Sequence, residues 1–286
     1  RRPAPLSRSR HGHDPKGKRV ACLKLGCTAV SVLLVVIANT ANAADWRFAP
    51  RSRLFQPLLA DPTETQFSIL KYTNNSRLEG TIGGSWEAFD AKRANGSTVR
   101  IGIHAGVFTL LRKTGPTFPL EMTDFLFGLH TDVQQGHFSG RFEFAHVSAH
   151  LADGFSDPVR RPFTYSREYF TFYGAYSWHW LRVYSSLRLS NHAIPNIKRW
   201  RLQIGSEAVT RSLLGEKARM YAAYDLRIFN ALGTVTNLTA HLGILFHSPS
   251  GSGLRAAIVG HSGRSEHGQF FDVRDQYIGL GLFLDL

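Results

Sequence analysis

The sequence predicts an all-β fold, namely a twelve-stranded antiparallel transmembrane β-barrel with short periplasmic turns and longer extracellular loops. Apolar and polar residues alternate with a two-residue period, in segments of about ten residues, as in strands with one apolar and one polar face. The connections between these segments are alternately short and long, and the polar face carries arginines in strand after strand. These three features are typical of bacterial outer-membrane barrels, whose apolar face contacts lipid.

The alternation is clearest in 277–286, where one parity is Ile or Leu throughout and the other is Tyr, Gly, Gly, Phe and Asp. Outer-membrane barrels usually end in an aromatic residue, whereas this sequence ends in Leu286. Twelve candidate strands start near Thr65, Gly80, Thr98, Thr123, His137, Glu168, Leu181, Trp200, Lys217, Leu238, Leu254 and Gln276. Outer-membrane barrels of one bacterial chain have an even number of strands.

The connections fall into two length classes. Short turns, expected at the periplasmic end, are 94–97, 133–136, 178–180, 213–216 and 248–253. Longer polar loops, expected outside the cell, are 113–121, 153–165, 191–199, 230–237 and 263–275. This layout is the one that outer-membrane barrels share.

The competing architecture is a secreted β-sandwich, in which the inward faces of both sheets are apolar. The basic polar face favours the barrel, whose charges line the lumen. The residues predicted to line it are Arg100, His104, Asp124, His130, Arg182, Arg188, Arg201, Glu207, Arg219, Asp225 and Arg227. Aromatic girdles are expected from Trp178, Trp180, Tyr165, Tyr169, Phe170, Phe172 and Tyr173.

Residues 1–43 predict an N-terminal extension and a Sec-type signal peptide. Basic residues precede the apolar run 28–38, and a small-x-small site ends at Ala43, near which cleavage is expected. Residues 44–64 are then expected to form an irregular periplasmic lead-in, and 65–286 the barrel in the bacterial outer membrane. No later segment has the roughly 20 apolar residues of a membrane helix.

The composition narrows the range of partners. The chain has a net charge of +13, but residues 1–43 hold eight of its 34 bases, one of its 21 acids and both cysteines. The mature chain is therefore only mildly basic and cannot be a disulfide scaffold or a multi-cysteine metal fold. No phosphate loop, nucleotide fingerprint or zinc motif is evident, so neither cofactor nor nucleic acid is expected. The expected partners are outer-membrane lipids including lipopolysaccharide, and the barrel-assembly machinery during insertion.

Four segments resemble an uncharacterised bacterial envelope family, domain of unknown function 1207. They are FQPLLADP at 55–62, HVSAHLAD at 146–153, WRLQ at 200–203 and HGQFF at 267–271. The family's histidine stretch reads His-x-Ser-Ser-His-Leu-Gly-Asp-Glu, from which Ala149, Ala152 and Gly154 depart. The resemblance covers roughly 54–286 and implies an envelope location without an established activity.

The strongest candidate for chemistry is His146 with Ser148. Strict alternation places both on the same face as the phenylalanines before them, toward lipid. At about 3.3 Å per residue and a tilt of roughly 40°, His146 lies about 23 Å above His137, in the outer leaflet. A serine becomes nucleophilic when an imidazole takes its proton and an acid orients that imidazole. The pair is similar to the His-x-Ser pairs of outer-membrane phospholipase A and of barrel-type lipid A deacylases. Asp153 and Glu168 are the candidate acids.

Other interpretations stay open. Histidine and serine are ordinary near the membrane interface, and a β-bulge near Ala145 would return the pair to the lumen. Candidate ligand-binding residues are the loop bases Arg160, Arg161, Lys198 and Arg199, which would attract lipid phosphates, and the histidine cluster of His261 and His267. No metal site is expected. The favoured role is structural or lipid-contacting. The alternatives are an outer-leaflet lipid esterase and a small, weakly anion-selective pore.

Overall fold

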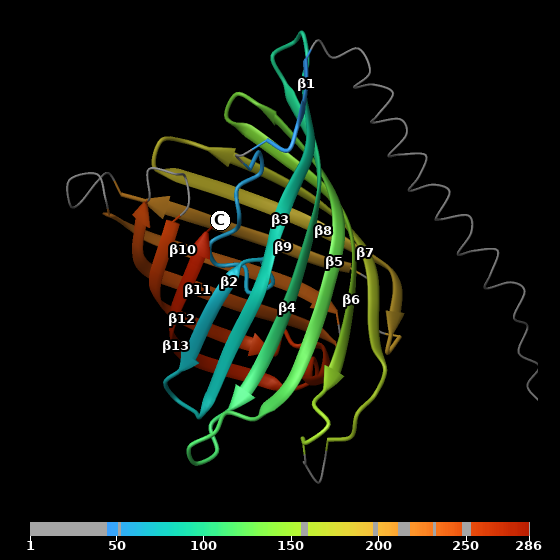
Figure 1. The fold of residues 1–286 in the computed structure, drawn as a ribbon, viewed down its shortest axis with the longest axis vertical. Helices are drawn as coiled ribbons and strands as arrows, with labels where there is room; N and C mark the ends of the chain where they lie inside the picture. Colours follow the sequence, from blue (N-terminus) through green and yellow to red (C-terminus); the bar gives the residue numbers. More distant parts are fainter. Residues whose placement is uncertain are drawn as a thin grey trace, which may run out of the picture. The chain divides into compact units, whose positions relative to one another are not determined.

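Residues 45–50, 53–155, 160–196, 200–210, 218–230, 233–247 and 253–285 are described by a computed structural model. Twelve of its strands close into an antiparallel barrel (Figure 1), because β13 pairs with β2 and each other strand pairs with its chain neighbours. This confirms the predicted fold class and strand number. Within these ranges no helix is long and apolar enough to cross a membrane.

The strands follow one another along the chain with few interruptions. They are β1 (Asp45–Phe48), β2 (Phe67–Tyr72), β3 (Arg77–Lys92), β4 (Thr98–Arg112), β5 (Leu120–Gln135), β6 (Phe138–Leu151), β7 (Tyr165–Ser177), β8 (Leu181–Ile194), β9 (Trp200–Val209), β10 (Ala218–Asn230), β11 (Thr234–His247), β12 (Gly253–Arg264) and β13 (Arg274–Asp285). A short 3₁₀ helix, η1 (Gly268–Phe270), lies between β12 and β13.

The alternation of the sequence becomes the two faces of the barrel wall. Large apolar side chains are exposed on the outside, for example Ile82, Phe127, Leu242, Ile278 and Leu280. The predicted lumen residues are buried or half-buried on the inside. An apolar outer surface around a charged interior is the arrangement that a lipid bilayer stabilises.

Two details of the predicted layout are wrong. The expected loop at 230–237 is short, since β10 ends at Asn230 and β11 begins at Thr234. Trp178 and Trp180 are exposed at a short turn as expected. Tyr165 and Tyr169, however, are buried in the lumen, and Tyr173 packs against Phe55 of the interior, so these three belong to no outer girdle. The signal peptide, the expected turn 213–216, all but the last residue of the expected turn 248–253, and Leu286 lie outside the described residues.

The segment expected as an irregular periplasmic lead-in takes a different course. Asp45–Phe48 forms β1, which pairs with the extension of β3, and 53–66 then runs inside the barrel (Figure 1, blue). The backbone N–H of Leu59 donates to Glu207 at 2.7 Å, and Arg182 donates to the carbonyl of Gln56 at 2.9 Å. We call residues 53–66 the plug.

Asp61 fixes the plug to the barrel wall. Its carboxylate is buried and accepts hydrogen bonds from Arg227 on β10 and from Gln203 on β9, the latter at 2.8 Å. Burial disfavours the charged form, but the guanidinium groups of Arg227 and Arg201 hold the pKa of Asp61 well below its usual range. Arg227 also pairs with Asp225 and Glu266, both at 2.8 Å, so one cation joins three acids.

We expect Asp61→Asn to lower the free energy of unfolding by about 2 kcal/mol, because Arg227 loses one of its three acids and the plug loses its charge-assisted hydrogen bonds to the wall. Urea unfolding of the barrel in detergent micelles measures the change. Asp153→Asn, in an exposed loop, is the control and should change it by less than about 0.5 kcal/mol. Equal stability of the two variants would show that this ion pair does not hold the plug.

Candidate functional site

His146 and Ser148 lie on the lipid-facing surface of β6. The pairing of β6 with β5 and β7 runs without a register shift, so no bulge returns them to the lumen. The His146 side chain is 46% exposed, whereas its neighbour Ala145 is fully buried. Strict alternation therefore holds through this strand, as expected from the phenylalanines before it.

Glu168 provides a carboxylate beside this pair. Glu168 on β7 is the direct cross-strand partner of His146, and its Oε1 lies 3.8 Å from His146 Nδ1. Ser148 is the next residue on the same face of β6, toward the long-loop end, and its cross-strand partner on β7 is Ser166. The imidazole thus has a carboxylate on its Nδ1 side, which leaves Nε2 for another partner. No hydrogen bond joins Ser148 to His146 in the described structure; catalytic hydrogen bonds often tighten only when substrate binds.

A β-bulge adds His192 to this group, which the sequence analysis missed. The register of β7 and β8 shifts after Glu168, so Glu168 faces His192 while Tyr169 faces Ser190. Asn191 is the extra residue, and it reverses the parity of β8. His192 is therefore exposed on the outer face, whereas Ser190 lines the lumen. We call His146, Ser148, Ser166, Glu168 and His192 the outer polar patch.

Apolar side chains of β5 flank the outer polar patch. Phe125 and Phe127 on β5 are the cross-strand partners of Ser148 and His146, and they are 47% and 54% exposed. A polar group with one carboxylate thus interrupts a surface that is otherwise built to contact acyl chains. Such groups near the membrane are costly unless they reach water or headgroups.

The other predicted residues do not join this patch. Asp153 lies beyond the end of β6, is exposed and makes no contact with His146. Arg160 pairs with Asp272 at 2.9 Å, and Arg161 is exposed in the same loop. Lys198 and Arg199 lie outside the described residues.

His261 and His267 are both buried in the lumen and line the same cavity, but their contacts differ. His261 stacks on Tyr277 and contacts the hydroxyl of Thr239 at 2.9 Å. His267, next to η1, lies between Glu79 at 3.4 Å and Asp124 at 3.5 Å. Burial opposes its charge, but the hydrogen bonds to Asp124 and Glu79 raise the pKa of His267 to about 10.

This ion cluster holds η1 across the long-loop end of the lumen. The N–H of Gly268 donates to Asp124, and the side-chain amide of Gln269 donates to the carbonyl of Ala149 at 2.8 Å. Gly268 must be a glycine, since an added Cβ would lie 2.6 Å from that of Ala149. The HGQFF segment therefore forms an internal cap. It lies near the end of the plug, since Asp61 and Glu266, which precedes the cap, both bind Arg227.

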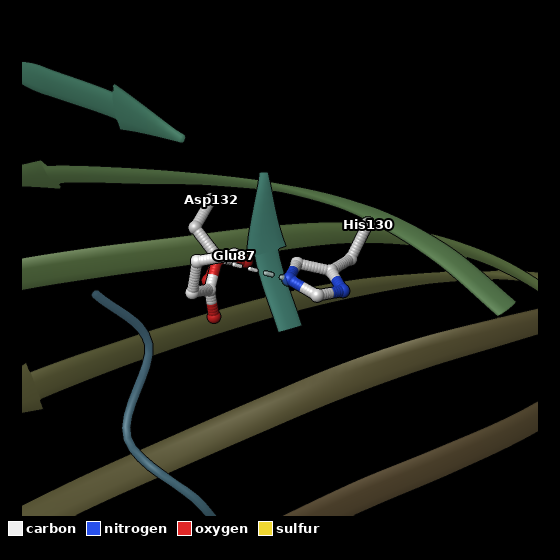
Figure 2. A group of neighbouring side chains, drawn as sticks. All are labelled: Glu87, His130 and Asp132. Carbon is white, nitrogen blue, oxygen red and sulfur yellow. Dashed lines mark hydrogen bonds and ion pairs between the residues drawn. The ribbon is translucent and has the colours of Figure 1, made fainter. Parts of the chain in front are cut away.

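Glu87, His130 and Asp132 form the one group among the described residues whose spacing suits a metal ion (Figure 2). His130 Nε2 lies 3.3 Å from Glu87, but Arg141 donates to both oxygens of Asp132, at 2.7 and 2.8 Å. A carboxylate already bound by a guanidinium is a poor cation ligand, so the donor set fits an ion-pair network better. Glu87 and Asp132 were missed, although their parity in the strands could have indicated the lumen.

The plug and the cap also bear on the pore alternative. The plug crosses the lumen and binds residues of five strands, β5, β8, β9, β10 and β12. Three of the six predicted lumen arginines are bonded to acids, namely Arg100 to Asp90, Arg182 to Glu207 and Arg227 to three carboxylates. These contacts favour a filled interior over a conducting pore.

Comparison with known proteins identifies the family. Residues 27–285 match the family described as "Protein of unknown function (DUF1207)". The chain belongs to this family. This confirms the resemblance carried by the four motif segments, three of which form the plug, β9 and the cap. No curated protein matches the sequence significantly.

Solved structures share the fold at low sequence identity. The outer membrane phospholipase of Salmonella typhi, solved as a dimer with bound calcium, aligns at TM-score 0.51 and 13% identity, over 86% of this chain and 96% of that one. The Escherichia coli outer membrane phospholipase A aligns at TM-score 0.48 and 14% identity, covering 86% and 96%. The β-domain of the Bordetella autotransporter BrkA aligns at 0.44 and 12%, covering 77% and 96%. The chain is thus an outer-membrane-type β-barrel.

The cap should make stability dependent on pH. The pKa of His267 is raised from 6.5 to about 10, so its stabilisation is complete below about pH 6.5 and is lost as the pH rises through 10. Between these limits we expect a loss on the order of 1.4 kcal/mol per pH unit. Urea unfolding of the parent and of His267→Gln between pH 6 and 10 isolates this contribution. An identical pH dependence in the two proteins would contradict it.

Proposed function

We propose that the protein is an outer-membrane lipid esterase, with Ser148 as nucleophile, His146 as general base and Glu168 as the acid that orients His146. The observation that carries this proposal is the 3.8 Å approach of Glu168 Oε1 to His146 Nδ1 on the lipid-facing surface, with Ser148 beside them. A nucleophile, a base and an orienting carboxylate are the three roles that acyl transfer needs.

The proposed reaction has two half-reactions. Ser148 Oγ attacks the ester carbonyl while its proton passes to His146 Nε2. The tetrahedral intermediate collapses, the C–O bond to the alcohol breaks, and the alcohol leaves with the proton from His146. Water then attacks the acyl-serine, giving its proton to His146, and the fatty acid leaves as Ser148 regains a proton. Glu168 stabilises the imidazolium in both halves.

The surroundings suit a membrane lipid as the substrate. Phe125 and Phe127 flank the pair and provide an apolar surface for acyl chains. The estimated height of His146 is that of the ester bonds of outer-leaflet lipids. The Salmonella typhi barrel of the same fold is named a phospholipase, so this architecture is compatible with lipid hydrolysis.

The decisive assay is fatty-acid release by the purified protein from mixed micelles of phospholipid or lipopolysaccharide. We expect Ser148→Ala and His146→Ala to reduce kcat at least 1000-fold each, because members of a catalytic unit fail together. Glu168→Gln should reduce it about 10- to 100-fold, since the base loses only its orienting charge.

Ser166→Ala is the matched control. Ser166 faces Ser148 across the strand pair on the same outer surface, but it has no role in the proposed reaction. This variant should keep the parent activity. Hydrolysis by Ser148→Ala at the parent rate, or no hydrolysis of any tested ester lipid by the parent, would refute the proposal and leave a structural or lipid-contacting role.

The proposal also includes the cellular location. We expect a mature chain in the bacterial outer membrane, surrounded by lipid including lipopolysaccharide and inserted by the barrel-assembly machinery. N-terminal sequencing should give a start just after Ala43, and the unboiled protein should migrate faster on a gel than the boiled one. Recovery in the soluble periplasmic fraction would contradict this location.

A further inference from the structure

A second site lies inside the barrel, independent of the proposed hydrolysis. A cavity of about 110 Å³ occupies the lumen near the long-loop end, next to the cap. A water molecule needs only roughly 10–15 Å³ of such space, so the cavity has room for a small polyatomic ligand. Three arginines from adjacent strands line one wall: Arg167 on β7, Arg188 on β8 and Arg201 on β9.

Two of these cations oppose one another directly. Arg188 and Arg201 are cross-strand partners in the pairing of β8 with β9, and both face the lumen. Like charges in directly opposite positions destabilise a sheet. Such a pair is expected only where something else offsets the repulsion.

Few groups of the protein offset the repulsion between Arg188 and Arg201. Arg188 Nε donates to the hydroxyl of Thr171 at 3.2 Å and stacks on Tyr169, while Arg167 lies over Tyr165. The nearest carboxylate to Arg201 is Glu266, at 3.9 Å. Among the described residues no acid lies within hydrogen-bond distance of any of the three. Arg167 Nε and two nitrogens of Arg201, Nε and Nη2, are buried without an acceptor.

The acids that line the same cavity are mostly committed elsewhere. Glu79 binds the hydroxyl of Tyr72 and His267, Asp124 binds His267 and the N–H of Gly268, and Glu266 binds Arg227 and Asn237. Asp275 lies on β13, away from the arginine wall. The cavity therefore has a basic wall with spare donors, whereas other lumen arginines such as Arg182 have bonded carboxylates.

We propose that this cavity binds a small oxyanion of the size of phosphate or sulfate, held by Arg167, Arg188 and Arg201. Guanidinium groups are planar donors that match the oxygens of such anions. A bound anion would place an acceptor at the buried nitrogens and offset the repulsion between Arg188 and Arg201. Tyr165 and Tyr169 form the apolar floor under two of the cations.

The test is thermal unfolding and isothermal titration calorimetry of the detergent-solubilised full chain. Inorganic phosphate and sulfate are each compared with chloride at equal ionic strength, and glycerol 3-phosphate represents a lipid headgroup. We expect phosphate to raise Tm and to bind with measurable heat. Stronger binding of glycerol 3-phosphate would assign the site to headgroups, and stronger binding of inorganic phosphate to the free ion.

Arg188→Gln and Arg201→Gln should weaken phosphate binding at least tenfold. Without phosphate their Tm should be equal to or above that of the parent, because the opposed charges are gone. Arg182→Gln is the matched control: losing the partner of Glu207 should lower Tm yet leave the phosphate-dependent shift intact. The proposal is overturned if the parent responds to phosphate no more than to chloride, or if Arg188→Gln and Arg201→Gln respond as the parent does.

Discussion

The structure depends on one electrostatic constraint: a wall that faces lipid must turn its charged side chains inward, where each needs a counter-charge. Arg227 shows how this constraint is met. It is fully buried and is paired with Asp225 on its own strand, Asp61 of the plug and Glu266 beside the cap. The charge of the wall therefore recruits the two irregular segments that fill the lumen. Without these acids the buried guanidinium would strongly destabilise the barrel.

This recruitment explains why the interior has the character of a packed core. The plug contributes backbone carbonyls, the N–H of Leu59 and the carboxylate of Asp61, so the wall arginines bind main chain as well as acids. The cap contributes a histidine cation to the two wall acids Glu79 and Asp124. The plug thus neutralises wall arginines, and the cap neutralises wall acids. The arginines that line the small cavity are wall cations that neither segment neutralises.

The period-two pattern was sufficient to predict the strands, because outside and inside differ sharply in polarity at every step. It could also place His146 and Ser148 outward, since no bulge interrupts β6. The plug could not be predicted in this way: Phe55, Leu59 and Asp61 have no periodicity, and their partners on the barrel wall lie more than 70 residues away. His192 was missed for a different reason, because the parity of β8 reverses at Asn191 and a bulge leaves no mark in composition.

Alternation also brings the two proposed sites onto opposite sides of the same strands. Val147, between His146 and Ser148, lines the inner cavity, and Arg167 precedes Glu168 on β7. The wall at this point is one peptide layer thick, so the outer polar patch and the arginine wall share backbone. A one-residue shift of β7 against β6 would exchange Arg167 with Glu168 and destroy both sites together. The uninterrupted pairing of β6 with β7 is therefore what keeps the outer carboxylate and the inner cation on their own sides of the barrel.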